Sequence, residues 1–166
     1  MKTLSVAYIG LGSNLGSREA TLHSACESLR DIASRGELWK SSIYKSVPFG
    51  GVSQGEFLNA AVALLCELTP EALLERLHDI ERQHGRRRNE EQRWGPRTLD
   101  LDLLVYSDIR ENTQTLVLPH PGIAERNFVL FPLNDLAPAL DVPGLGSVQT
   151  LMHGCPKSGI ERLTRV

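Results

Sequence analysis

The hydrophobic pattern of this chain changes its period in an order that few folds can accommodate. Apolar residues that alternate or run together predict strands, and apolar residues that recur every three to four positions predict helices. The resulting order, strand–helix–strand–strand–helix–strand, predicts a ferredoxin-like α+β sandwich with two helices on one face of a mostly antiparallel sheet. The other face, with its loops, is expected to be open for a site. The predicted strands are 4–11, 38–47, 57–68 and 99–106, and the predicted helices lie between residues 17 and 36 and between 69 and 85.

Local signals support these boundaries. Ser17 can cap the first helix, and Thr69 precedes a proline at the first position of the second helix. On one face the strand 57–68 carries Leu58 and every second residue up to Cys66. A further strand is expected at 113–118, and the C-terminal third is expected to add elements whose order its short apolar pieces do not predict.

The composition is that of an ordinary globular protein. The 166 residues are 41% apolar and 23% charged, with a net charge of −2, which gives no indication of a nucleic-acid or membrane partner. No linker or repeat divides the chain, so residues 1–166 are expected to form a single domain. The longest apolar run, 60–66, cannot span a bilayer, and the short apolar run at the N-terminus does not fit a signal peptide. Three widely spaced cysteines without a CxxC pair predict neither a disulfide framework nor a zinc site, and a cytoplasmic location is expected.

Two carboxylates interrupt the apolar run at 99–106. Asp100 and Asp102 are two positions apart on a predicted strand, so both project from the same face, while Leu99, Leu101 and Leu103 face the core. Ionised carboxylates so close together repel each other unless a positive charge lies between them. Magnesium is bound through one or two carboxylates together with substrate phosphates, which predicts a metal–phosphate site. The alternative is an exposed strand face with two solvated aspartates.

Arginines gather just before this strand. Six arginines lie between residues 82 and 97, a stretch that contains no aspartate. The planar guanidinium donates forked hydrogen bonds to phosphate oxygens, so arginines beside metal-binding carboxylates indicate a nucleotide-phosphate site. The alternative for the arginines alone is a solvated charge cluster.

Three other features allow more than one interpretation. The glycines of 10–16 have neither dinucleotide-binding nor P-loop spacing, so they are expected to form a structural turn. Asn59 is either an exposed strand residue or an amide that recognises the edge of a heterocycle. His120 lies between two prolines and, without further context, is a surface-loop histidine.

Together these stretches resemble one enzyme family, the 6-hydroxymethyl-7,8-dihydropterin pyrophosphokinases of folate biosynthesis. The segment RWGPRTLDLDLL at 93–104 is similar to the signature of the family, and the resemblance covers about residues 5–140. The other matching stretches are YIGLGSNLG at 8–16, FLNAAV at 57–62, IE at 80–81, LPHP at 118–121, RNFVL at 126–130 and PL at 132–133.

The resemblance implies a ferredoxin-like fold and transfer of the β,γ-pyrophosphoryl group of ATP to the hydroxymethyl oxygen of the pterin, with release of AMP. It implies ATP as co-substrate and two Mg²⁺ ions, and a monofunctional, monomeric enzyme is expected. The catalytic residues that it implies are Arg86, Arg97, Asp100 and Asp102, the last two as metal ligands. The implied ATP-binding residues are Leu74, Glu81, Arg86, Arg88, Arg97, Leu103, His120 and Arg126. The implied pterin-binding residues are Ser46, Val47, Phe49, Phe57, Asn59, Trp94, Asp100 and Phe128.

Some positions depart from the family pattern. Ser46 and Val47 stand where threonine and proline are common, and Phe57 stands where tyrosine is common. These departures concern affinity more than the type of reaction. Two competing hypotheses are a non-enzymatic ferredoxin-like module that binds RNA or a protein, and another phosphotransfer enzyme that shares only the ATP half of the site.

Overall fold

The computed structural model describes residues 2–47, 55–85 and 98–165, with side chains as far as residue 163. Its central element is a sheet in which the strands are ordered β10-β3-β4-β1-β5, with β2 also paired to β4. Every strand pair described in this sheet is antiparallel. The strands of this sheet are β1 (Ser5–Ser13), β2 (Leu38–Lys40), β3 (Ser42–Ser46), β4 (Phe57–Cys66), β5 (Asp100–Tyr106) and β10 (Ile160–Arg165).

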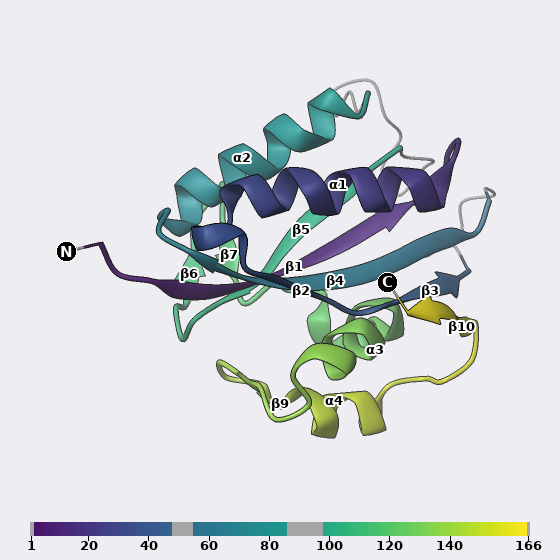
Figure 1. Cartoon of the computed structure of the whole chain (residues 1–166). Coiled ribbons are helices and arrows are strands. Elements are labelled where there is room, and N and C mark those ends of the chain that lie inside the picture. The colour runs from purple at the N-terminus through teal and green to yellow at the C-terminus, as the bar shows by residue number, and fades with distance from the viewer. Residues whose placement is uncertain (1, 48–54, 86–97, 166) are drawn as a thin grey trace.

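Helices lie on both faces of the sheet (Figure 1). α1 and α2 cover one face, and α3 and α4 lie against the other, so the molecule has three layers. Two-stranded ribbons and single 3₁₀ turns occupy the connections. The helices are α1 (Arg18–Ile32), α2 (Pro70–Gln83), α3 (Asn127–Leu136) and α4 (Val148–Gly154); the ribbons are β6 (Glu111–Asn112) with β7 (Val117–Leu118) and β8 (Asp141–Val142) with β9 (Gly146–Ser147); the 3₁₀ turns are η1 (Ser34–Gly36) and η2 (Ile123–Glu125).

The order β5-β1-β4-β3 confirms the ferredoxin-like prediction. The expectation that the second face would be open is only partly right, because α3 and α4 pack on it through a second core around Leu104, Ile123 and Leu130. The sequence carried no clear period there, since α3 contains an internal Pro132 and α4 spans only seven residues. The part of this face that α3 leaves free is where the site lies.

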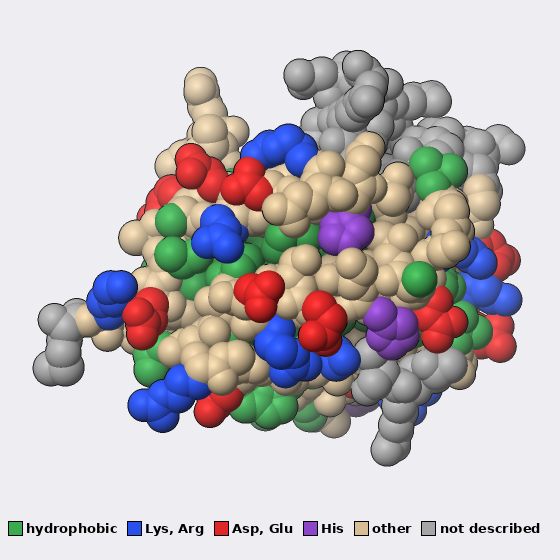
Figure 2. Space-filling view, turned by 45° about the horizontal axis from the view of Figure 1, so that its top comes forward, with side chains coloured by type: hydrophobic (Ala, Val, Ile, Leu, Met, Phe, Trp, Pro, Cys, Tyr) green, Lys and Arg blue, Asp and Glu red, His purple; other side chains and the backbone are tan. Residues whose placement is uncertain are grey.

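The main core lies between the sheet and the helices α1 and α2. The alternate residues of β4 from Leu58 to Cys66 all belong to it, as the two-residue period predicted, and so do Leu101 and Leu103 of β5. The outer side of this layer is polar, and Figure 2 shows acidic and basic side chains interspersed over it. In the part of the chain that the structure describes, no helix has both the length and the apolar character needed to cross a membrane.

The helix starts were predicted unequally well. The Thr69 hydroxyl accepts the backbone N–H of Ala72 at 3.2 Å, and Pro70 occupies the first helical position, as expected. Ser17 occupies the N-cap position of α1, but its side chain makes no capping hydrogen bond. The prediction of a side-chain cap at Ser17 was therefore wrong.

Two predicted strands are divided. The segment 38–47 is interrupted at Ser41, whose hydroxyl accepts the Ala61 N–H at 2.8 Å and donates to the carbonyl of Ser42 at 2.7 Å. The segment 113–118 is not one strand, because the Thr113 side chain accepts the Leu116 N–H and closes a turn between β6 and β7. Both breaks arise from hydroxyl groups that bond to nearby backbone.

Candidate functional site

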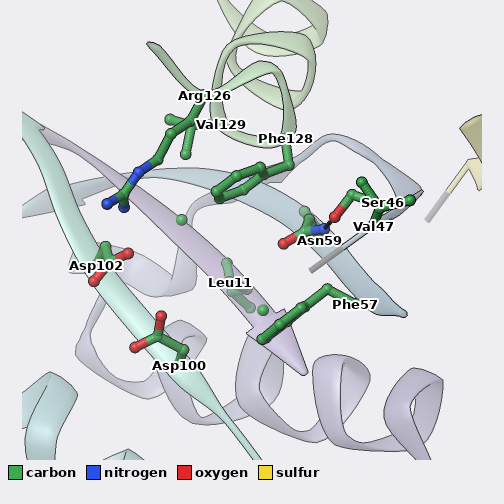
Figure 3. A pocket seen from close by; sticks show the side chains of 13 residues that line it. Leu11, Ser46, Val47, Phe57, Asn59, Asp100, Asp102, Arg126, Phe128 and Val129 are labelled. Atoms are coloured by element: carbon green, nitrogen blue, oxygen red, sulfur yellow. Dashed lines mark hydrogen bonds between the residues drawn. The ribbon is translucent and has the colours of Figure 1, made fainter. Parts of the chain in front are cut away.

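The pocket opens on the sheet face that α3 only partly covers, and Figure 3 shows it from close by. Five elements contribute to it: β1, β3, β4, β5 and the start of α3. Its volume is about 650 Å³, including space that is open to solvent. It is lined by Gly10, Leu11, Gly12, Ser46, Val47, Phe57, Asn59, Ala60, Asp100, Asp102, Arg126, Phe128 and Val129.

The two aspartates lie together at one side of this pocket. Both are half-buried and project from β5 toward the pocket, while Leu101 between them points into the main core. Asp100 is paired in register with Gly12 of β1, and Asp102 with Gly10. The prediction that the two carboxylates share one face of a strand is therefore confirmed.

The oxygen donors of this pair fit a hard divalent cation. Within the described part of the chain, no group of three or more His, Cys, Asp or Glu side chains could hold a metal ion. Two carboxylates at the mouth of a pocket suit Mg²⁺, which keeps several waters and takes further oxygens from substrate phosphates. Asp100 and Asp102 would be the residues that hold it.

The floor of the pocket is made of glycine. Gly10 and Gly12 lie inside β1. For Gly10 this agrees with the predicted strand 4–11, whereas the turn expected at Gly12 was wrong; the turn follows at Gly16, where φ is +66°. A Cβ on Gly12 would lie 3.3 Å from Asn59 Oδ1 and 3.6 Å from Phe57 Cδ1. Because Gly12 has no side chain, the pocket stays open and flat between Asn59 at one end and the two aspartates at the other.

A buried amide forms the polar end. Asn59 and Ser46 are 5% and 4% exposed, and Asn59 Nδ2 donates to Ser46 Oγ at 2.6 Å. This bond fixes the orientation of the amide, so that Oδ1 faces the pocket as an acceptor (Figure 3). The structure thus favours recognition of a ligand over an exposed strand position for Asn59.

Two aromatic rings form opposite walls. Phe57 begins β4, and Phe128 lies in the first turn of α3, and both rings project into the pocket (Figure 3). The Arg126 guanidinium lies 5.9 Å from the centre of the Phe128 ring, on the side of the pocket where Asp102 lies. The pocket therefore combines a slot for a flat ring with charged groups at one end.

His120 lies close to Asp102 without lining the pocket. Its backbone N–H donates to the Leu104 carbonyl at 2.8 Å, and its Nε2 is 3.9 Å from Asp102 Oδ1. Burial and then the charge of Arg126 lower its pKa from 6.5 to about 4, although Asp100 acts in the opposite direction. The ring is therefore neutral near pH 7, and because Gly122 N–H donates to Nδ1 at 3.1 Å, the proton is on Nε2, facing Asp102.

Besides His120, three candidates for the nucleotide site lie outside this pocket. Leu103 is 3% exposed in the main core, and Leu74 packs against the same core. Glu81 is 1% exposed, and its Oε2 accepts the Leu101 N–H at 2.9 Å, which secures β5 at the residue between the two aspartates. Their contacts with ATP stay predictions. Five further candidates lie outside the described residues: Phe49, Arg86, Arg88, Trp94 and Arg97.

Sequence reasoning missed five pocket residues: Gly10, Leu11, Gly12, Ala60 and Val129. The period of β1 could have revealed the glycines, since they alternate with Ile9 and Leu11, which face the main core. Nothing in the sequence placed Val129, because it depends on where α3 docks.

An antiparallel α+β sandwich with a carboxylate pair at one end of an aromatic slot defines the class of protein: a ferredoxin-like protein with a site for a flat small molecule. Comparison with known proteins identifies the family within this class. Residues 8–138 match the family of 7,8-dihydro-6-hydroxymethylpterin-pyrophosphokinase (HPPK), and the chain belongs to this family.

Individual relatives agree with this assignment. A 2-amino-4-hydroxy-6-hydroxymethyldihydropteridine pyrophosphokinase of Methylorubrum extorquens is 44% identical over 95% of this chain and 98% of its own. The enzyme of the same name from Bacillus subtilis is 43% identical over 95% of both chains. The crystal structure of wild-type Plasmodium falciparum HPPK-DHPS with STZ-DHP superposes with a TM-score of 0.69 at 14% identity, covering 93% of this chain and 42% of that one. The present chain therefore spans less than half of that longer protein, and the superposition concerns the fold alone.

Proposed function

We propose that this chain transfers the β,γ-pyrophosphoryl group of ATP to the hydroxymethyl oxygen of 6-hydroxymethyl-7,8-dihydropterin, giving the pterin diphosphate and AMP in folate biosynthesis. The observation that carries the proposal is one pocket that joins an aromatic slot with a buried amide to a pair of carboxylates. Membership of the family and the names of its relatives support the same reaction.

The pterin ring lies in the slot between Phe57 and Phe128, over Gly12. Flat stacking on aromatic faces gives apolar contact without a demand for hydrogen bonds. Asn59 Oδ1, oriented by its bond to Ser46, accepts a hydrogen bond from an N–H group at the ring edge. This placement directs the hydroxymethyl group toward Asp100, and Val47, Phe49 and Trp94 complete the pterin site through the resemblance to the family.

The phosphates of ATP lie beyond the aspartates. Asp100 and Asp102 would hold two Mg²⁺ ions, which would cancel phosphate charge and make the hydroxymethyl group more acidic. Arg126 is a cation that faces the same end of the pocket. Neutral His120 carries its proton on Nε2 and donates it in a hydrogen bond to a phosphate oxygen. The remaining nucleotide contacts are assigned through the resemblance, and they are Leu74, Glu81, Arg86, Arg88, Arg97 and Leu103.

The transfer itself needs positioning more than covalent chemistry from the protein. The hydroxymethyl oxygen forms a bond to the β-phosphorus, the bond between that phosphorus and the oxygen bridging to the α-phosphate breaks, and the electron pair leaves on AMP. The hydroxymethyl proton is released as the new bond forms. Arg86 and Arg97, the other proposed catalytic residues, stabilise the charge that gathers on the transferring group.

We propose the oligomeric state, the domain organisation and the cellular location of the enzyme separately. The chain is proposed to act as a monomer, and a single domain is supported by one sheet that joins β1, near the N-terminus, to β10, near the C-terminus. A cytoplasmic location is supported by three free cysteine thiols, at Cys26, Cys66 and Cys155, which are typical of a reducing compartment.

A product assay tests the reaction. Purified protein with Mg²⁺ and ATP is assayed for nucleotide products by chromatography, with and without the hydroxymethylpterin. We expect AMP and pterin diphosphate in equal amounts and only when the pterin is present. Formation of ADP would indicate a different phosphotransfer enzyme on the same fold, and no pterin-dependent turnover would favour a non-enzymatic module.

A further inference from the structure

We propose that the C-terminal strand β10 sets the shape of the pterin-binding end of the pocket, with Asn127, Asp135 and Arg162 as positioning residues. We call these three residues the C-terminal clamp. The identity of the ligand rests on the proposed function, whereas the contacts that form the clamp do not.

The first observation is the place of β10 in the sheet. It lies along the outer side of β3 as the edge strand, and Ile160 is paired with Ser46, a pocket residue (Figure 1). The next pocket residue, Val47, donates its N–H to the Gly159 carbonyl at 3.1 Å. Gly159 has a φ of +75°, and a Cβ there would lie 3.0 Å from Val47 Cγ2. The end of β3 that lines the pocket is thus held by residues 159 and 160.

The second observation is a half-buried acceptor that joins three elements. Asp135, near the end of α3, accepts from the Ser42 N–H at 3.1 Å, from the Tyr44 hydroxyl at 2.9 Å and from Arg162 Nη2 at 2.6 Å. The side chain of Asp135 is 14% exposed, and the Arg162 guanidinium lies 5.7 Å from the centre of the Tyr44 ring. Asp135 therefore fastens α3 to β3 and to β10 together.

The third observation lies at the opposite end of α3. Asn127 Nδ2 donates to the carbonyls of Pro156 and Ser158, both at 2.9 Å. Asn127 stands between Arg126 and Phe128, which both line the pocket. The segment that leads into β10 is therefore attached at the turn of α3 from which the Phe128 ring projects.

These contacts set the two sides of the pterin slot relative to each other. One side is Phe128 on α3, and the other is Ser46 on β3 with the Asn59 amide that it orients. Residues 156–162 are bound to both ends of α3 and paired with β3. A change in the clamp should therefore weaken pterin binding more than nucleotide binding, because the two aspartates of the nucleotide end lie on β5, at the opposite edge of the sheet from β10.

The test compares Asn127→Ala and Arg162→Ala with a control on the same strand, Glu161→Ala. Glu161 forms a surface ion pair with Lys45 at 3.5 Å, so its removal perturbs the β3–β10 edge without removing a clamp residue. Calorimetry gives the Kd of each variant for the hydroxymethylpterin and for a non-hydrolysable ATP analogue. Each clamp variant loses two hydrogen bonds that position the slot and do not touch the ligand, so we expect pterin binding to weaken only about fivefold. The Kd for the analogue and the kcat should stay within about twofold of the wild type, and so should the pterin Kd of the control. Arg162→Lys keeps a positive charge near Asp135 but loses the contact with the Tyr44 ring, so it should restore only part of the affinity.

Equal weakening of both ligands, or pterin binding like that of the wild type in both clamp variants, would overturn the inference. If Arg162→Ala does not fold, Asn127→Ala decides alone, since it removes only a half-buried amide. Failure of the proposed function is seen separately, as a wild-type protein that forms no pterin-dependent AMP.

Discussion

The glycine floor of the pocket gives the sharpest prediction, for Gly12→Ala. The added Cβ would lie 3.3 Å from Asn59 Oδ1, 3.6 Å from Phe57 Cδ1 and 4.0 Å from Asp100 Cβ. It would occupy the space assigned to the pterin ring and press on the amide that recognises it. Overpacking by one methyl group costs about 2 kcal/mol, which corresponds to a roughly 30-fold higher Kd for the pterin.

The fold should tolerate this change, because Gly12 lies in extended backbone within β1. We expect the free energy of unfolding in urea to stay within about 1 kcal/mol of the wild type. Calorimetric titration with the hydroxymethylpterin measures the loss, and Gly154→Ala, where a Cβ meets nothing within 4 Å, is the matched control. A Gly12→Ala protein with wild-type pterin affinity would refute the placement of the ring over this strand.

Three further predictions concern single side chains. Asn59→Ala should weaken pterin binding about tenfold and leave the ATP analogue unaffected in calorimetry, since it removes a buried acceptor at the pterin end only; a parallel loss of both ligands would count against this role. Glu81→Ala leaves the Leu101 N–H without its carboxylate acceptor and should lower the free energy of unfolding in urea by about 1–3 kcal/mol; an unchanged midpoint would contradict this. Burial lowers the pKa of His120 to about 4 in the folded chain, so as the pH falls the imidazole of the unfolded chain is protonated before that of the folded chain. The free energy of unfolding should therefore decrease as the pH falls from 6.5, the ordinary pKa of histidine, to about 4. A decrease just as steep in His120→Asn would show that another group causes it.

The sequence predicted the parts of the fold whose period is long and regular. The alternation in β4 and β5 correctly separated the core residues, such as Leu58 and Leu101, from the pocket residues Asn59 and Asp102. Thr69 correctly marked the start of α2, because a hydroxyl at the N-cap position satisfies a free backbone N–H.

The remaining features depend on tertiary contacts. Glycines are depleted in strands, so those of β1 suggested a turn, whereas pairing with β4 and β5 on both sides keeps Gly10 and Gly12 extended. The proximity of His120 to Asp102 follows from the His120 N–H bond to the Leu104 carbonyl, which no sequence period encodes. The docking of α3 by Asp135 could not be predicted either, since its partners are more than 25 residues away in the chain.

The pair of carboxylates on β5 is the basis of the proposed reaction, and cation binding tests it most directly. Mn²⁺ can replace Mg²⁺ as an electron paramagnetic resonance probe, titrated into the wild type and into Asp102→Asn with a non-hydrolysable ATP analogue and the pterin present. The wild type should bind two ions per chain, and Asp102→Asn, with a wild-type circular dichroism spectrum, should lose at least one of them together with pterin-dependent AMP release. Equal binding of both ions by the folded variant would contradict the assignment of Asp102 as a metal ligand.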